Sequence, residues 1–259
     1  NSQCKYTLLL DEHAGILDDL IVTRLGAHHF MIVANAGNAA ADEKHLQTVA
    51  RGLDCTIEPL DRVFLALQGP DAETVLTAAG IDVGHLTFMH GFQPRPDWFL
   101  SRSGYTGEDG FEIAVPLEDG AALAANLLAD ERVRWIGLAA RDSLRLEAGL
   151  CLHGHDIDPS TDPVSAGLMW AIPKPVRERG GFIGAEALAR KIASGATEKR
   201  VGLRPEGRQP VRDGAKLFTD DGKPAGRVTS GGFVPSFEAP VAMGYVGAKT
   251  LVDFHERAE

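Results

Sequence analysis

The apolar and polar positions between Lys5 and Gly195 alternate between strand-like and helix-like spacing. Short apolar runs bounded by turn residues are typical of strands. They occupy Lys5–Leu10, Ile16–Leu25, His29–Ala34 and Val63–Gln68. Wider, helix-like spacing covers Asn38–Arg51, Leu117–Leu128, Leu138–Glu147 and Gly181–Ala193. A glycine-rich hairpin is expected over Phe99–Pro116, and no regular strand–helix–strand repeat is visible. This mixture favours an α+β fold over a doubly wound parallel sheet.

The pattern changes after Lys199, where short apolar stretches are separated by Gly, Pro and Asp turns. Four such stretches are Val201–Leu203, Ala215–Phe218, Arg227–Thr229 and Ala242–Val246. Closely spaced short strands of this kind predict a small β-barrel or sandwich. We therefore place a domain boundary near Gly195.

Net charge, apolar run length and cysteine spacing restrict the kinds of partner and the cellular compartment that we expect. The 259 residues carry 26 Lys plus Arg against 36 Asp plus Glu, a net charge of −10, which disfavours a broad nucleic-acid surface but allows a small anionic ligand. No apolar run reaches the roughly 18 residues of a membrane span, and the first residues do not resemble a signal peptide. The three cysteines, Cys4, Cys55 and Cys151, are far apart, so we expect reduced, apolar packing residues.

Two adjacent carboxylates, Asp18 and Asp19, lie inside an apolar strand pattern. Alternation sends their side chains to opposite faces, so at least one is expected to face a core or a cleft. A buried carboxylate is costly unless it is paired or used. The alternative is that both lie at the exposed start of the strand.

The glycine-rich segment Ser103–Ile113 brings an aromatic side chain and several carboxylates together. Glu112 lies between Phe111 and Ile113 and should point away from them. A planar heterocycle with N–H donors could stack on Tyr105 and donate to Glu112. A solvated hairpin tip is the alternative.

Arg141 and Arg145 lie four residues apart on one expected helix face, where two cations could bind a carboxylate. The alternative, which fits Arg145 well, is pairing with Asp142 and another acid.

The cluster from His153 to Asp156 has the residue types of a metal site but lacks further spaced ligands. A turn with polar packing is the favoured interpretation.

Taken together, six motifs resemble the aminomethyltransferase, or T-protein, family of the glycine cleavage system. They are Ile16–Val22, Gly104–Gly110, Gly137–Leu152, Phe182–Leu188, Val228–Gly231 and Ala242–Val246. The resemblance extends from about Lys5 to Val246, nearly the whole chain. It rests on all six motifs in the family's order and not on any single motif.

The resemblance implies a three-lobed α+β fold, with ferredoxin-like-type lobes around a central cavity and a C-terminal β-barrel. The implied parts are residues 1–62 of the first folate-binding lobe, residues 63–195 forming the second lobe and a return to the first, and residues 196–259 of an incomplete barrel. The implied reaction moves the aminomethyl carbon from the lipoyl arm of the H-protein to tetrahydrofolate. Tetrahydrofolate is a co-substrate, and no metal, nucleic acid or membrane is involved.

The resemblance also implies site residues. Asp19 matches the catalytic acid, Glu112 the pterin-binding glutamate and Arg141 the site arginine. Tyr105 matches a cavity tyrosine, Tyr6 matches a residue of the pterin wall, and Asn35 and Trp170 are weaker matches. The acidic H-protein is expected to meet a basic patch at Arg132 and Arg134 or at Lys174–Arg179. The implied location is the cytoplasm in bacteria or the mitochondrial matrix in eukaryotes.

The chain departs from the family at three places. It starts inside the first lobe, so part of that lobe and some folate contacts are expected to be missing. The tail after Val246 is short for a complete barrel, and Thr250–Glu259 does not align. His153 stands where the family usually has a tyrosine, which bears on hydrogen bonding in the cavity.

Three other interpretations use the same residues. A folate-dependent demethylase module usually accompanies a flavin domain, and no dinucleotide fingerprint is present. A non-catalytic folate-binding protein of the iron–sulfur-assembly type carries a cysteine near Gly180–Gly184, where this chain has none. A purely structural docking subunit does not need the polar residues gathered in the glycine-rich segment.

Overall fold

A computed structural model describes residues 2–250 of the chain. The chain divides into two compact units. The first contains the residues up to Tyr6 and Leu20–Arg141, and the second contains Thr7–Asp19 and the chain from Asp142 onward. The residues from 251 to the end, which include most of the tail that does not align with the family, lie outside the described part.

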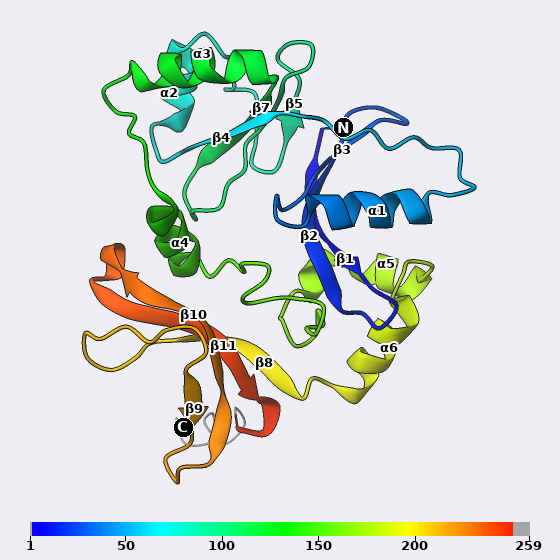
Figure 1. Cartoon of the computed structure of the whole chain (residues 1–259), viewed down its shortest axis with the longest axis vertical. Helices are drawn as coiled ribbons and strands as arrows, with labels where there is room; N and C mark the ends of the chain where they lie inside the picture. The colour runs from blue at the N-terminus through cyan, green and yellow to red at the C-terminus, as the bar shows by residue number, and fades with distance from the viewer. Residues whose placement is uncertain (1, 251–259) are drawn as a thin grey trace. The chain divides into compact units, whose positions relative to one another are not determined.

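The first unit is built on a four-stranded antiparallel sheet of strand order β4-β7-β6-β5. Its strands are β4 (Val63–Gln68), β5 (Gly91–Phe92), β6 (Phe99–Ser101) and β7 (Gly110–Val115). Helices α2 (Ala72–Ala78) and α3 (Leu117–Leu128) cover one face of this sheet (Figure 1). Phe111, Ile113 and Val115 are completely buried under them. Removal of these apolar side chains from water stabilises the packing of the helices on the sheet.

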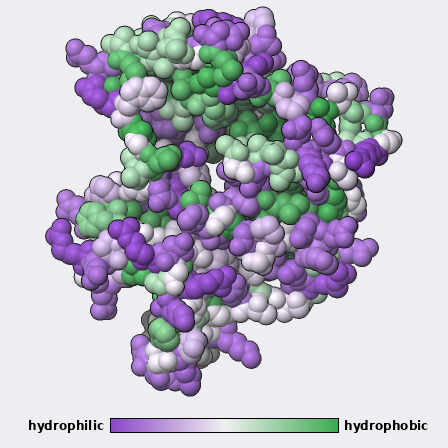
Figure 2. Space-filling view, in the orientation of Figure 1, coloured by the Kyte–Doolittle hydropathy of each residue, from purple (hydrophilic) through white to green (hydrophobic). Residues whose placement is uncertain are grey.

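The outer surface of α3 is mostly alanine and leucine. Hydrophobic residues accordingly gather over this helix in Figure 2. The described part of the chain contains no helix with both the length and the apolar character that a membrane span requires.

A second sheet has three strands in the order β1-β2-β3. Its strands are β1 (Cys4–Leu10), β2 (Ile16–Arg24) and β3 (Phe30–Val33), and helix α1 (Ala39–Val49) follows in the first unit. In that unit, Cys4 packs against Phe99 and Ala114 on the face of the other sheet that α2 and α3 leave uncovered.

The second unit contains the end of α4 (Leu138–Glu147), followed by short helices and an antiparallel sheet. The helices are η1 (Met169–Ala171), α5 (Lys174–Arg179), α6 (Ala185–Ser194) and η2 (Pro235–Phe237). The sheet has the order β8-β11-β10-β9, with strands β8 (Glu198–Leu203), β9 (Lys216–Phe218), β10 (Pro224–Val234) and β11 (Ala239–Gly247). Leu146 of α4 packs with Val234 and Met243, so α4 is fixed to this sheet by an apolar contact.

The α+β prediction is confirmed, and the bounds of α3 and α4 agree with the expected helices. One helix and one cysteine differ from expectation. Helix α5 is absent from the sequence prediction because its six residues are too few to show helical periodicity. Its first turn contains a proline, which is a position that proline suits. Cys55 was expected to pack in a core and is exposed instead, whereas Cys4 and Cys151 are buried and all three are free thiols.

Candidate functional site

The carboxylate of Glu112 occupies a fixed position on β7 of the first unit. Alternation along β7 sends Phe111 and Ile113 into the core under the helices and Glu112 to the opposite face, as the sequence predicts. There the buried hydroxyl of Ser103 donates to Oε2 of Glu112 at 2.7 Å. The hydroxyl of Ser101 lies 2.7 Å from that of Ser103. Glu112 is half-buried, so it is not part of a fully solvated hairpin tip.

The segment between β6 and β7 is held by an ion pair at its base. Arg102 donates through Nε and Nη2 to both oxygens of Asp109, at 2.9 and 2.6 Å, and its Nη2 also lies 2.9 Å from Glu73. Hydrogen bonding from Arg102 lowers the pKa of Asp109 against the opposing effect of burial. The guanidinium of Arg102 is also 5.3 Å from the ring centroid of Phe111. These contacts fix the shape of the glycine-rich segment.

Two of the predicted site residues meet in the first unit. The guanidinium carbon of Arg141 lies 4.4 Å from the centroid of the Tyr105 ring, in cation–π geometry. Tyr105 is half-buried and Arg141 is exposed. An aromatic face next to an exposed cation can contact both a planar ring and a carboxylate of one ligand.

Tyr6 and Asn35 flank the cluster around Cys4. Tyr6 lies two residues after Cys4 on β1 and therefore points to the same side of the strand. Burial is the main cause that raises the pKa of the Cys4 thiol; a hydrogen bond from Thr23 opposes it, and the charge of Glu112 adds to it. Cys4 thus lies within the electrostatic reach of Glu112. Asn35 follows the end of β3 by two residues, and both Tyr6 and Asn35 are half-buried.

In the second unit, the two adjacent carboxylates of β2 have different environments. Asp18 is completely buried between Ile16 and Leu20, whereas Asp19 is half-buried on the other face of the strand. Nδ1 of His153 lies 3.8 Å from Oδ1 of Asp18. Nε2 of His153 is 3.1 Å from the carbonyl oxygen of Ile16, which only accepts, so this nitrogen donates. The prediction that one carboxylate faces a core is confirmed, and the alternative that both are exposed is wrong.

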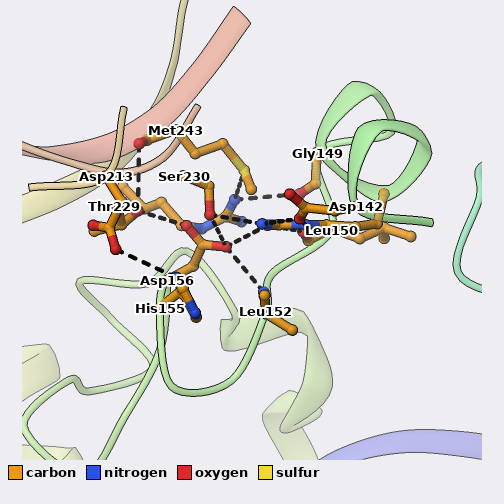
Figure 3. Close-up of polar contacts among 12 residues, drawn as sticks. Asp142, Gly149, Leu150, Leu152, His155, Asp156, Asp213, Thr229, Ser230 and Met243 are labelled. Atoms are coloured by element: carbon orange, nitrogen blue, oxygen red, sulfur yellow. Dashed lines mark hydrogen bonds and ion pairs between the residues drawn. The ribbon is translucent and has the colours of Figure 1, made fainter. Parts of the chain in front are cut away.

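Arg145 is buried and engaged by acids, so its pairing, and not ligand binding, explains its presence. It donates to Asp142 through Nε at 2.7 Å and to Asp156 through Nη1 at 2.6 Å (Figure 3). Its Nη2 donates to Ser230 on β10 at 2.8 Å. The hypothesis that Arg141 and Arg145 act as two cations for one ligand is therefore wrong for Arg145.

Asp156, from the His-Gly-His-Asp cluster, is a buried acceptor. Its carboxylate accepts from the backbone N–H of Leu152 and from the hydroxyls of Thr229 and Ser230, all within 2.9 Å. Within residues 2–250, no group of three or more His, Cys, Asp or Glu side chains is arranged to hold a metal ion. The favoured interpretation of this cluster as polar packing is confirmed for Asp156.

Trp170 lies on η1 of the second unit and is 65% exposed. The indole presents most of its surface to solvent, which suits contact with a ligand or a neighbouring segment more than a role in the core.

Sequence reasoning missed Gln68, which lies under the glycine-rich segment. Its Nε2 donates to the carbonyl oxygens of Ser103 and Phe111 at 3.0 and 3.3 Å, and its Oε1 accepts from Thr106 at 3.2 Å. The sequence does hold one signal for it, because the segment has glycines at both ends, Gly104 and Gly110, and a Cβ at either position would overlap Gln68.

Comparisons with known proteins agree on one family. Residues 1–175 match the family model described as the GCVT N-terminal domain. Residues 198–258 match the one described as the glycine cleavage T-protein C-terminal barrel domain. The crystal structure of glycine cleavage system aminomethyltransferase T from Bartonella henselae superposes with a TM-score of 0.95 at 58% sequence identity, covering 96% of this chain and 69% of that one.

The curated relatives that match the chain are named as aminomethyltransferases. The mitochondrial aminomethyltransferase of Flaveria trinervia is 42% identical over 252 residues, which cover 93% of this chain and 62% of that protein. The mitochondrial aminomethyltransferase of Homo sapiens is 42% identical over 255 residues, covering 95% of this chain and 63% of the human protein. The chain thus spans less than two thirds of the length of these relatives.

Proposed function

The chain belongs to the glycine cleavage T-protein family, and we propose that it acts as a tetrahydrofolate-dependent aminomethyltransferase. The reaction takes the aminomethyl carbon from the lipoyl arm of the H-protein and gives 5,10-methylenetetrahydrofolate, ammonia and the dihydrolipoyl protein. The observation that carries the proposal is the half-buried carboxylate of Glu112, held by Ser103 on a rigid strand. A carboxylate in a fixed orientation is a suitable acceptor for the adjacent N–H donors of a pterin ring.

The proposed folate-binding residues are Glu112, Arg141, Tyr105, Tyr6, Asn35 and Trp170. Glu112 accepts from the pterin N–H groups, and Tyr6 forms part of the pterin wall. Tyr105 lines the ligand cavity, and Arg141, stacked on the Tyr105 ring, supplies a cation for a carboxylate of the folate tail. The fit of these residue types to one ligand with a planar ring and an acidic tail supports their assignment.

Asp19 is the proposed catalytic acid–base group. The donor carbon is bonded to a lipoyl sulfur and to an amino nitrogen. Attack by the folate N5 forms a C–N bond while ammonia leaves with the N5 proton, and attack by N10 then displaces the sulfur, which takes up a proton as the thiol. Asp19, near N10, steers these protons and supports the positive charge that develops on the carbon. Its partial exposure, in contrast to the buried Asp18, leaves its carboxylate accessible to a substrate.

The lipoylated H-protein is the proposed partner, and the three-part division at residues 62 and 195 is the proposed domain organisation. The proposed location is the bacterial cytoplasm or the mitochondrial matrix, and the names of the plant and human relatives describe those proteins as mitochondrial.

The proposal is tested by measuring aminomethyl transfer from the loaded H-protein to tetrahydrofolate with the full-length protein. Asp19→Asn is expected to keep tetrahydrofolate binding and to lower the turnover number by about 10²–10⁴-fold, the effect typical of a lost acid–base group. Asp213→Asn, an exposed carboxylate of the second unit that pairs with His155, serves as the matched control. A fully active Asp19→Asn protein would contradict the catalytic role, and no transfer by the wild-type protein would contradict the activity.

A further inference from the structure

Two buried serine hydroxyls form a directed chain that ends on Glu112. Ser101 and Ser103 are each 3% exposed and their hydroxyl oxygens are 2.7 Å apart. A hydroxyl has a single hydrogen to donate, and an ionised carboxylate only accepts. Because the Ser103 hydrogen goes to Oε2 of Glu112, the hydrogen between the two serines comes from Ser101. Each hydrogen bond in such a chain strengthens the next one through polarisation.

Gln68 holds Ser103 in place from the other side. The carbonyl oxygen of Ser103 accepts from Nε2 of Gln68, whose amide also bonds to Phe111 and Thr106 across the glycine-rich segment. A Cβ at Gly104 would come within 1.9 Å of Gln68, so the side chain fills the space that this glycine leaves. The backbone of Ser103 is thus anchored independently of the hydroxyl that reaches Glu112.

We propose that Ser103 is a positioning residue that sets the ligand specificity of Glu112. An ionised carboxylate offers about four acceptor positions, and Ser103 occupies one of them on Oε2. This contact fixes the plane of the carboxylate before a ligand arrives. The two oxygens are then presented together to a ligand edge with two adjacent N–H donors, such as the ring N–H and the 2-amino group of a pterin. The inference rests on the proposed function and deepens it.

Without the Ser103 hydroxyl, Glu112 is free to rotate, and each ligand must immobilise it on binding. Immobilising one flexible side chain corresponds to a loss of roughly twofold to tenfold in affinity. The loss is largest for a ligand that needs both oxygens in one plane. A ligand with a single donor at this edge tolerates more orientations of the carboxylate. Loss of the Ser103 hydroxyl therefore reduces the ratio of the affinity for a two-donor ligand to the affinity for a one-donor ligand.

The test is calorimetric titration of the full-length protein with tetrahydrofolate and with its 2-desamino analogue, which lacks one of the two donors. Ser103→Ala is expected to weaken tetrahydrofolate binding by about fivefold to tenfold. It should weaken binding of the analogue less, so the ratio of the two affinities falls. In steady-state assays the same variant should raise KM for tetrahydrofolate and leave kcat unchanged. Ser103→Cys places a weak donor in the same position and should show the same changes as Ser103→Ala. It provides the test if the alanine variant does not fold.

Ser165→Ala is the matched control, because Ser165 is also a buried serine that donates to a carboxylate, here Asp162 at 3.1 Å, in the second unit. Unchanged tetrahydrofolate affinity and unchanged selectivity in folded Ser103 variants, with binding by the wild-type protein intact, would overturn the inference and leave the proposed function standing. Absence of tetrahydrofolate binding by the wild-type protein would overturn the proposed function and the inference with it.

Discussion

The guanidinium of Arg145 and the carboxylate of Asp156 form an ion pair of 2.6 Å in which both side chains are almost completely buried. Arg145 belongs to α4, and Asp156 belongs to the loop that follows it. The same carboxylate accepts from Thr229 and Ser230 on β10. The hydroxyl of Tyr245 on β11 donates to the backbone carbonyl of Asp156 at 2.7 Å. The pair therefore ties α4 and its loop to the sheet of the second unit.

Replacement of Asp156 by alanine should destabilise the second unit strongly. The charge of Arg145 would remain buried without its Asp156 partner, and loss of one partner from a buried pair costs about 3–5 kcal/mol. Urea unfolding followed by circular dichroism measures the change in the free energy of unfolding. Asp213→Ala, which removes an exposed ion pair with His155, should change it by no more than about 1 kcal/mol. Equal effects of the two replacements would show that the buried network does not stabilise the unit.

The three thiols should differ sharply in their reaction with a thiol reagent such as Ellman's reagent at pH 8. Burial raises the pKa of Cys151 to about 11 and also raises that of Cys4, so both stay protonated and shielded, whereas Cys55 is exposed. Because the thiolate is the reactive form, we expect one fast thiol and two that react only after local or global unfolding.

Cys55→Ser should remove the fast phase and leave the slow phases unchanged. Cys4 lies in the first unit and Cys151 in the second, so their separate rates report on the opening of each unit. Two or more fast thiols in the native protein would contradict the packing around Cys4 or Cys151.

Local periodicity was sufficient to predict the orientation of Glu112, because the apolar residues on either side of it fix the faces of β7. The same reasoning separated Asp18 from Asp19, although it could not decide which of them is buried. On the buried side of β2, His153 comes from a distant part of the chain and approaches Asp18 and the carbonyl of Ile16, a contact that no local pattern reveals. The assignment of roles to Asp19 and Glu112 came from the family resemblance and not from the pattern.

Long-range partners explain what the sequence did not reveal. Gln68 bonds to Ser103 and Phe111, which are 35 and 43 residues further along the chain. Arg145 reaches Ser230 across 85 residues. Such contacts leave no periodic signal in one sequence, and only the flanking glycines hinted at the space that Gln68 fills. The α5 helix was missed because it is too short to show helical periodicity.

Calorimetric titration of the full-length protein with tetrahydrofolate, beside Glu112→Ala, tests the central claim most directly. Glu108→Ala is the matched control, because Glu108 is an exposed carboxylate in the same glycine-rich segment. We expect the wild-type and Glu108→Ala proteins to bind with dissociation constants on the order of micromolar, in the range usual for enzyme substrates, and the Glu112→Ala protein to lose binding. No binding by the folded wild-type protein, or equal binding by the Glu112→Ala protein, would contradict the placement of the pterin at Glu112.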